Sequence, residues 1–237
     1  MSIDLAPFGT AQRWRHEYKY MIDGRQEAIL RVKAECVLSR DPHTRPDGLY
    51  LVRSLYFDDF DDTCLWENLS GCDPRSKFRI RYYNDESDRL FLEKKTKRQG
   101  MCLKESCGLS REECAFYICG AFPPINNEMP PQKQRLLAEI QSRGLRPKTI
   151  VTYARRPYVY SGGNVRVTSD SGIASSGEIG NFLSKPCAQR PVLPCGQHIL
   201  EVKWDEVMPR HIKEMILPEG AKWIAFSKYT MCRKHHL

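Results

Sequence analysis

Charged side chains recur on one face of segments that otherwise have the composition of β-strands. Residues 77–82 read Lys-Phe-Arg-Ile-Arg-Tyr. Because successive side chains of a strand point to opposite faces, the three basic residues share one face and the three apolar or aromatic residues share the other. A charged face costs free energy unless it borders water or opposite charge. The pattern therefore predicts a barrel with a charged, hydrated interior and an apolar outer face.

The same alternation occurs in four separate parts of the chain. Each pair stands two residues apart and so on one face of its strand: Glu17 and Lys19, Arg79 and Arg81, Glu93 and Lys95, Glu201 and Lys203. Any one of these segments, taken alone, is equally consistent with a solvated edge strand of an antiparallel sheet. Four independent solvated strands would have no reason to share this alternation of charged residues, so its recurrence favours one shared interior.

The composition fits a globular protein that binds anions. The chain has 237 residues, a formal net charge of +8 and 41% hydrophobic residues, which predicts one domain over residues 1–237. No leader sequence and no apolar run of membrane-spanning length is found, so we expect a cytoplasmic protein. The ten cysteines lack zinc-hook spacing and are expected to be reduced thiols.

The order of elements predicts an α+β fold with helices packed on the outside of the barrel. Strands are expected at 14–21, 50–57, 77–83, 89–97, 101–107, 149–160, 163–169 and 198–204. Helices are expected at 24–37, 59–69, 110–119, 132–143 and 209–216. Ser110 and Glu113 form a capping-box signature at the third helix.

The predicted lining contains more cations than carboxylates. Its basic members are Lys19, Arg79, Arg81, Lys95, Lys104, Arg155, Arg166, Lys203 and Lys228. Its acidic members are Glu17, Glu93 and Glu201. Arginine forks and lysine point charges suit a chain of phosphates better than a single carboxylate ligand. Because Mg²⁺ or Mn²⁺ in phosphoryl transfer is held by one or two carboxylates plus the substrate, Glu201 is the first candidate metal ligand, with Glu17 and Glu93 as weaker ones.

Eight short motifs follow one another along the chain. They are Glu17-Tyr18-Lys19-Tyr20, Ser54-Leu55-Tyr56-Phe57-Asp58, Arg79-Ile80-Arg81-Tyr82-Tyr83, Leu92-Glu93-Lys94-Lys95, Tyr153-Ala154-Arg155, Val165-Arg166-Val167-Thr168-Ser169-Asp170, Leu200-Glu201-Val202-Lys203 and Phe226-Ser227-Lys228-Tyr229. In these motifs and their order, the chain resembles the VTC domain over about residues 13 to 232. This family is the catalytic domain of the vacuolar transporter chaperone polyphosphate polymerase and belongs to the triphosphate tunnel metalloenzyme superfamily.

The resemblance implies an eight-stranded antiparallel tunnel. It implies that the γ-phosphoryl group of a nucleoside triphosphate, ATP in our expectation, passes to inorganic polyphosphate or pyrophosphate with Mn²⁺ or Mg²⁺. The residues implied to grip phosphate and act in catalysis are Lys19, Arg79, Arg81, Lys95, Lys104, Arg155, Arg166 and Lys228. Glu201 would hold the metal, and Lys203 joins the phosphate-binding set through strand alternation alone.

The chain also departs from the family pattern. It has no regulatory SPX domain and no membrane helices, so a membrane partner is possible but not implied. Arg15 stands where a further acid would complete the alternating acidic motif found in the superfamily's two-metal enzymes. Two alternatives to a polymerase remain at this stage: a triphosphate hydrolase or nucleotidyl cyclase, and a non-catalytic polyphosphate or polyanion binder. A nucleic-acid partner is not expected.

Other residues have structural interpretations that we favour over functional ones. The acidic group Asp58, Asp59, Asp61 and Asp62 is expected to cap the following helix instead of binding a metal. Asp170 is expected in a turn. The aromatic residues Tyr82, Tyr83, Tyr153, Tyr158 and Tyr160 are expected to pack outward under helices instead of stacking on bases.

Overall fold

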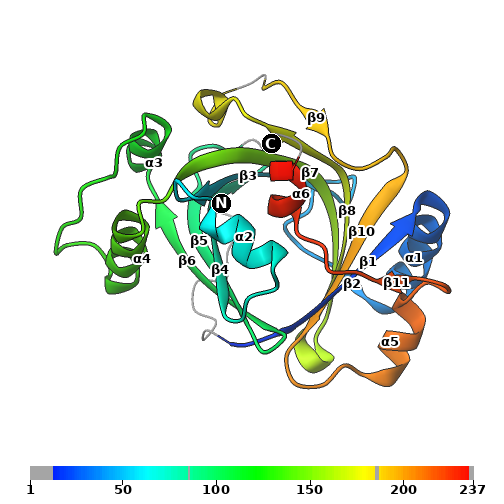
Figure 1. Ribbon diagram of the computed structural model, residues 1–237. Coiled ribbons are helices and arrows are strands. Elements are labelled where there is room, and N and C mark those ends of the chain that lie inside the picture. The colour runs from blue at the N-terminus through cyan, green and yellow to red at the C-terminus, as the bar shows by residue number, and fades with distance from the viewer. Residues whose placement is uncertain (1–12, 85, 185–186, 235–237) are drawn as a thin grey trace.

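Eight long antiparallel strands form a curled sheet in the computed structural model, which describes residues 13–84, 86–184 and 187–234 (Figure 1). They are β1 (His16–Asp23), β3 (Tyr50–Asp58), β4 (Arg75–Tyr83), β5 (Leu90–Arg98), β6 (Met101–Leu109), β7 (Arg146–Tyr160), β8 (Val165–Ser176) and β10 (Gln197–Trp204). Each of the eight overlaps a predicted strand, although β8 continues seven residues beyond its predicted end at residue 169. Three two-residue strands were not predicted: β2 (Ser39–Arg40), β9 (Arg190–Pro191) and β11 (Lys222–Trp223).

The sheet curls until its two ends meet. Its strand order is β11-β1-β10-β8-β7-β3-β4-β5-β6, and every pairing is antiparallel. The backbone N–H of Arg15, just before β1, donates to the carbonyl of Cys102 on β6 at 3.0 Å, and the N–H of Cys102 donates back at 2.9 Å. These two bonds join the start of β1 to β6 at one point and so connect the two sides of the sheet, which confirms the predicted antiparallel tunnel.

Six α-helices in the described part of the chain surround or cap the sheet. They are α1 (Gly24–Val37), α2 (Thr63–Leu69), α3 (Arg111–Ile118), α4 (Pro131–Ser142), α5 (Arg210–Ile216) and α6 (Lys228–Lys234). The predicted capping box at Ser110 and Glu113 is present. Helix α6 was not predicted; it packs against α2, β7 and β8 at one opening of the curled sheet (Figure 1). No helix in the described ranges has the length and apolar character needed to cross a bilayer.

The apolar core lies on the outer face of the sheet, as predicted. Phe78, Ile80 and Leu92 are fully buried there, together with side chains of α3 and α4. A second cluster packs Leu30 of α1 and Ile212 of α5 against β1, β8 and β10. Burial of apolar surface is the main favourable term in folding. The outer layer therefore supplies most of the stability of the fold, which the charged inner face cannot supply.

Helix α2 begins four residues later than predicted, because the acidic residues before it act as its cap. One carboxylate oxygen of Asp58 accepts from the backbone N–H of Cys64 at 2.8 Å, and the other accepts from that of Leu65 at 3.0 Å. Asp59 accepts from the N–H of Thr63 at 2.8 Å. Side chains that satisfy the free N–H groups of a first turn stabilise it. The predicted capping role of this acidic group is therefore confirmed for Asp58 and Asp59.

Candidate functional site

Glu93 of β5 is the centre of the first of three charge clusters inside the tunnel. Its carboxylate accepts from Arg79 Nε at 2.6 Å and from Lys104 Nζ at 3.1 Å, and Arg81 Nη1 lies 3.6 Å away. Burial raises the pKa of Glu93, but Lys104, Arg79 and Arg81 outweigh that effect and hold the pKa well below its usual range. Glu93 therefore remains ionised and sets the positions of the two β4 arginines.

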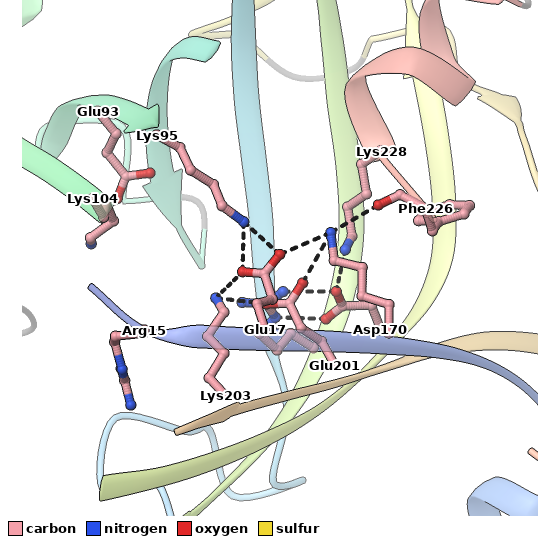
Figure 2. A network of polar contacts seen from close by, with 12 residues as sticks. Arg15, Glu17, Glu93, Lys95, Lys104, Asp170, Glu201, Lys203, Phe226 and Lys228 are labelled. Atoms are coloured by element: carbon pink, nitrogen blue, oxygen red, sulfur yellow. Dashed lines mark hydrogen bonds and ion pairs between the residues drawn. The ribbon is translucent and has the colours of Figure 1, made fainter. Parts of the chain in front are cut away.

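The second cluster joins Glu17 and Lys19 of β1 to Glu201 and Lys203 of β10, which are cross-strand neighbours (Figure 2). Lys95 Nζ contacts both oxygens of Glu17 at 2.6 Å. Lys203 Nζ lies 2.7 Å from Glu201 and 3.4 Å from Glu17. Lys19 Nζ lies 3.2 Å from Glu17 and 3.6 Å from Glu201. Three lysines thus share two carboxylates, and the positive charge exceeds the negative.

Both carboxylates of this second cluster stay ionised despite their burial. Burial and the neighbouring Glu201 raise the pKa of Glu17, but Lys95, Lys19 and Lys203 bring it well below its usual range. Burial also raises the pKa of Glu201, and Lys203 and Lys19 lower it more. Two ionised carboxylates beside each other offer oxygen ligands of the kind that Mg²⁺ and Mn²⁺ prefer. The donor set therefore fits a divalent ion that takes its remaining ligands from phosphate and water.

Asp170 of β8 is the centre of the third cluster, so its assignment to a turn was wrong. The carboxylate is fully buried and accepts from Arg155 Nε at 2.6 Å and Nη2 at 2.7 Å, while Lys228 Nζ lies 2.5 Å away. The alternation of Arg166, Thr168 and Asp170 on one face of β8 was the signal that could have identified it. Burial raises the pKa of Asp170, but Arg155 and Lys228 outweigh it and the pKa is lowered.

Arg166 lies apart from these clusters although it shares the β8 face of Asp170. Its Nη2 donates to Asp41 at 2.9 Å and to the hydroxyl of Tyr50 at 2.8 Å. Its side chain is 36% exposed, and that of Lys104 is 56% exposed. These two cations are therefore accessible to solvent, whereas Arg81 and Arg155 are buried.

Two of the five tyrosines expected on the outer face lie inside the tunnel instead. Tyr153 accepts a hydrogen bond from Arg81 Nη2 at 3.2 Å, and the Arg81 guanidinium lies 5.9 Å from the ring centre of Tyr83. Both residues stand on the same strand face as a lumen arginine, so strict alternation would have placed them correctly. The remaining three pack against the outer core as predicted: Tyr82, Tyr158 and Tyr160.

Lys228 reaches the lumen from the first turn of α6 instead of from a strand. The segment before it, residues 223–227, crosses from β11 into the opening of the tunnel. Lys19 Nζ donates to the carbonyl of Phe226 at 2.9 Å, and Lys77 Nζ donates to the hydroxyl of Ser227 at 2.7 Å. Lys77 was recognised as sharing the face of Arg79 but was not included among the candidate site residues.

Eight of the nine predicted cations, together with Lys77, therefore share the lumen with four carboxylates, Glu17, Glu93, Asp170 and Glu201, while Arg166 pairs with Asp41 outside these clusters. In the described ranges, no three side chains of His, Cys, Asp or Glu converge as a ready metal site. Asp58, considered above as a metal ligand, instead accepts from α2 and from the hydroxyl of Tyr229 at 2.5 Å. The arrangement can bind a polyanion and neutralise charge that develops on phosphoryl oxygens.

Comparisons with known proteins identify a family and a shared fold. The family described as VTC domain matches residues 14–236. HpAC1 from Hippeastrum, a proposed adenylyl cyclase described as having a dominant triphosphatase activity, is 16% identical with a TM-score of 0.53, covering 94% of this chain and 96% of that chain. A proposed adenylate cyclase from Bacillus halodurans is 16% identical with a TM-score of 0.49, covering 87% of each chain. No curated protein sequence matches the chain. The likeness to HpAC1 shows a shared fold.

Proposed function

The chain belongs to the VTC domain family, in the triphosphate tunnel superfamily, and from this we propose that it is a metal-dependent polyphosphate polymerase. It transfers the γ-phosphoryl group of a nucleoside triphosphate, ATP in our proposal, to inorganic polyphosphate. The observation that carries the proposal is the excess of cations over carboxylates within one enclosed lumen. Such an excess is costly in a protein interior unless an anion offsets it.

We assign phosphate binding to the predicted cations. Arg79 and Arg81 extend from one strand, so their guanidinium groups can each contact phosphate oxygens while Glu93 fixes their orientation. Lys228 and Arg155 approach from α6 and β7, with Asp170 between them. The lumen thereby holds the triphosphate on several sides, which favours one alignment of the γ-phosphorus with the acceptor.

The reaction needs no covalent enzyme intermediate. A terminal phosphate oxygen of the acceptor attacks the γ-phosphorus, the bond from that phosphorus to the β–γ bridging oxygen breaks, and the nucleoside diphosphate leaves with the bonding electron pair. The lumen cations neutralise negative charge on the equatorial and bridging oxygens. Because their positions are fixed by Glu17, Glu93, Asp170 and Glu201, little reorganisation is required during transfer.

Glu201, assisted by Glu17, would hold the divalent ion. A divalent ion held there would withdraw charge from phosphate oxygens. Glu93 suits that role less well, because Glu17 and Glu201 are neighbouring carboxylates on paired strands, whereas the charged groups that contact Glu93 are all cations. Arg15, which departs from the acidic motif, pairs with Asp205 at 2.6 Å and donates to the carbonyl of Asn164. That pairing leaves no extra carboxylate at this position and supports polymer formation over two-metal hydrolysis.

The test is to incubate the purified protein with labelled ATP and Mn²⁺ or Mg²⁺ and to separate the products on a gel. We expect a ladder of long phosphate chains. Release of orthophosphate without polymer would identify a triphosphate hydrolase, and cyclic nucleotide would identify a cyclase. The absence of turnover, combined with salt-dependent binding of polyphosphate, would identify a binder.

Glu201→Gln provides the matched variant for this test. It removes a carboxylate from the proposed metal site while preserving side-chain shape, so we expect at least about a 100-fold loss of transfer with polyphosphate binding retained. Lys213→Met, on the exposed surface of α5, is the control and should leave the rate unchanged. Unchanged turnover in Glu201→Gln would refute the metal assignment.

A further inference from the structure

A small cavity lies where residues 223–227 cross the opening of the tunnel. Its volume is about 120 Å³. Basic side chains from three strands line it: Lys19, Arg75, Lys77, Lys95 and Lys97. Glu17 is the carboxylate in this lining, and it already contacts Lys95 and Lys19. The cavity is therefore continuous with the second charge cluster but has its own set of cations.

Three of these cations have no carboxylate partner among the residues that the structure describes. Arg75 donates to the carbonyl of Cys72 at 2.6 Å, and Lys77 donates to the Ser227 hydroxyl at 2.7 Å. Lys97 makes no ion pair within the described ranges. All three side chains are half-buried. This differs from the rest of the lumen, where Glu17, Glu93, Asp170 or Glu201 lies within 4.0 Å of most of the cations.

Lys77 in particular is held in an unfavourable environment. Burial lowers its pKa, and the nearby charges of Lys19, Lys95 and Arg75 lower it further, to well below the usual range. Its hydrogen-bond acceptor is the neutral hydroxyl of Ser227, and the nearby charge of Glu17 raises the pKa without reversing the shift. A multiply charged anion in the cavity would offset the charge of Lys77 and would gain charge-assisted hydrogen bonds in return.

We propose that Arg75, Lys77 and Lys97 form a second anion subsite that binds the terminal phosphates of the inorganic polyphosphate acceptor. This inference rests on the proposed polymerase function. The cavity has the volume of roughly four water molecules, which accommodates phosphoryl groups but not a nucleoside. Its continuity with Lys19 and Lys95 allows an acceptor bound here to extend toward the triphosphate held deeper in the lumen.

The first test measures binding without turnover. Inorganic tripolyphosphate is titrated calorimetrically into the protein, alone and with a saturating non-hydrolysable ATP analogue. We expect the protein to bind two equivalents of tripolyphosphate without the analogue and one equivalent in its presence. Lys77→Met should lose one equivalent in each condition, or bind that equivalent at least about tenfold more weakly. Lys97→Met should show a similar, smaller weakening, and Lys213→Met should match the unchanged protein.

The outcomes separate this subsite from the polymerase proposal. One equivalent in the unchanged protein, or equal binding by Lys77→Met, overturns the subsite whether or not polymer forms. Two equivalents that depend on Lys77 support the subsite even if ATP yields no polymer. If sulfate bound as tightly as tripolyphosphate, the cavity would be an unselective anion-binding site, and the acceptor assignment would be overturned. If Lys77→Met does not fold, Lys77→Arg and Ser227→Ala are used in its place. The Lys77→Arg variant should still bind the second equivalent of tripolyphosphate. Loss of that equivalent in Lys77→Arg would contradict a charge-based site.

A kinetic measurement then assigns the bound anion to the acceptor. Polymer formation is followed at varied concentrations of polyphosphate primer, the acceptor, and a fixed concentration of ATP, and then with the two exchanged. Lys77→Met should raise the KM for primer about tenfold or more and leave the KM for ATP nearly unchanged. An equal rise in both values would place Lys77 in the nucleotide site and overturn the inference.

Discussion

The two faces of strand β4 differ completely although they belong to the same nine residues. The outer face packs Phe78 and Ile80, both fully buried, into the apolar core. The inner face presents Lys77, Arg79 and Arg81 to the lumen. The outer face contributes stability through burial of apolar surface, while the inner face concentrates like charge at a cost in stability. The comparison indicates that stability supplied by the outer layer allows the inner face to be arranged for binding a ligand.

The sharpest test of this division is Phe78→Ala on the outer face. Removing a fully buried phenyl ring leaves a cavity, so we expect the free energy of unfolding to fall by about 3–5 kcal/mol. Urea denaturation followed by circular dichroism measures the change. Below the unfolding transition the phosphoryl-transfer rate should stay within about twofold of the unchanged protein, because the lost ring faces away from the lumen. A stability change under about 1 kcal/mol would break the comparison.

The inner-face counterpart is Arg81→Met. Glu93 keeps Arg79 at 2.6 Å and Lys104 at 3.1 Å, so no carboxylate is left without a partner. We expect transfer from ATP to slow about 100- to 1000-fold, as when a single preorganised charge-stabilising group is removed. The melting temperature should change little. A large fall in melting temperature with normal residual activity would show that Arg81 serves the fold instead of the ligand.

Lowering the pH should reveal how much the carboxylates of the inner face contribute to the stability of the unmodified protein. The folded-state pKa values of Glu17, Glu93, Asp170 and Glu201 lie below their ordinary values of about 4. The unfolded chain therefore binds more protons as pH falls, so the stability from these groups is present above about pH 5 and is lost progressively below it. Urea midpoints at several pH values measure the loss. A midpoint that stays constant down to about pH 3 would contradict it.

The smallest expected effect is proton uptake on binding at Lys77. Its pKa is lowered in the free protein, and a bound anion would raise it, so tripolyphosphate binding should take up part of a proton. Affinity should therefore fall as pH rises through the lowered pKa. Calorimetry in two buffers of different ionisation enthalpy measures the uptake, and Lys77→Met should abolish that contribution. Identical uptake in both proteins would show that another group titrates.

Much of the architecture was predictable from local pattern. Local sequence patterns located all eight long strands and five of the six helices in the described part of the chain. Helix α6 was missed although Ser227 caps it by accepting a hydrogen bond from the backbone N–H of Thr230 at 3.2 Å. The helix is short, and its position depends on contacts with β7, β8 and α2. Tyr83 and Tyr153 were assigned to the wrong face because their aromatic character was given more weight than their strand position.

The sequence alone determined which side chains share a strand face, because a strand's period of two is a local property of the backbone. It therefore predicted a basic interior that contains a minority of carboxylates. Only the tertiary structure decided which cation each carboxylate neutralises, since those pairs span strands distant in the chain and depend on register and curvature. Asp170 with Lys228, and Lys77 with Ser227, meet only because α6 and the segment before it occupy the opening of the tunnel.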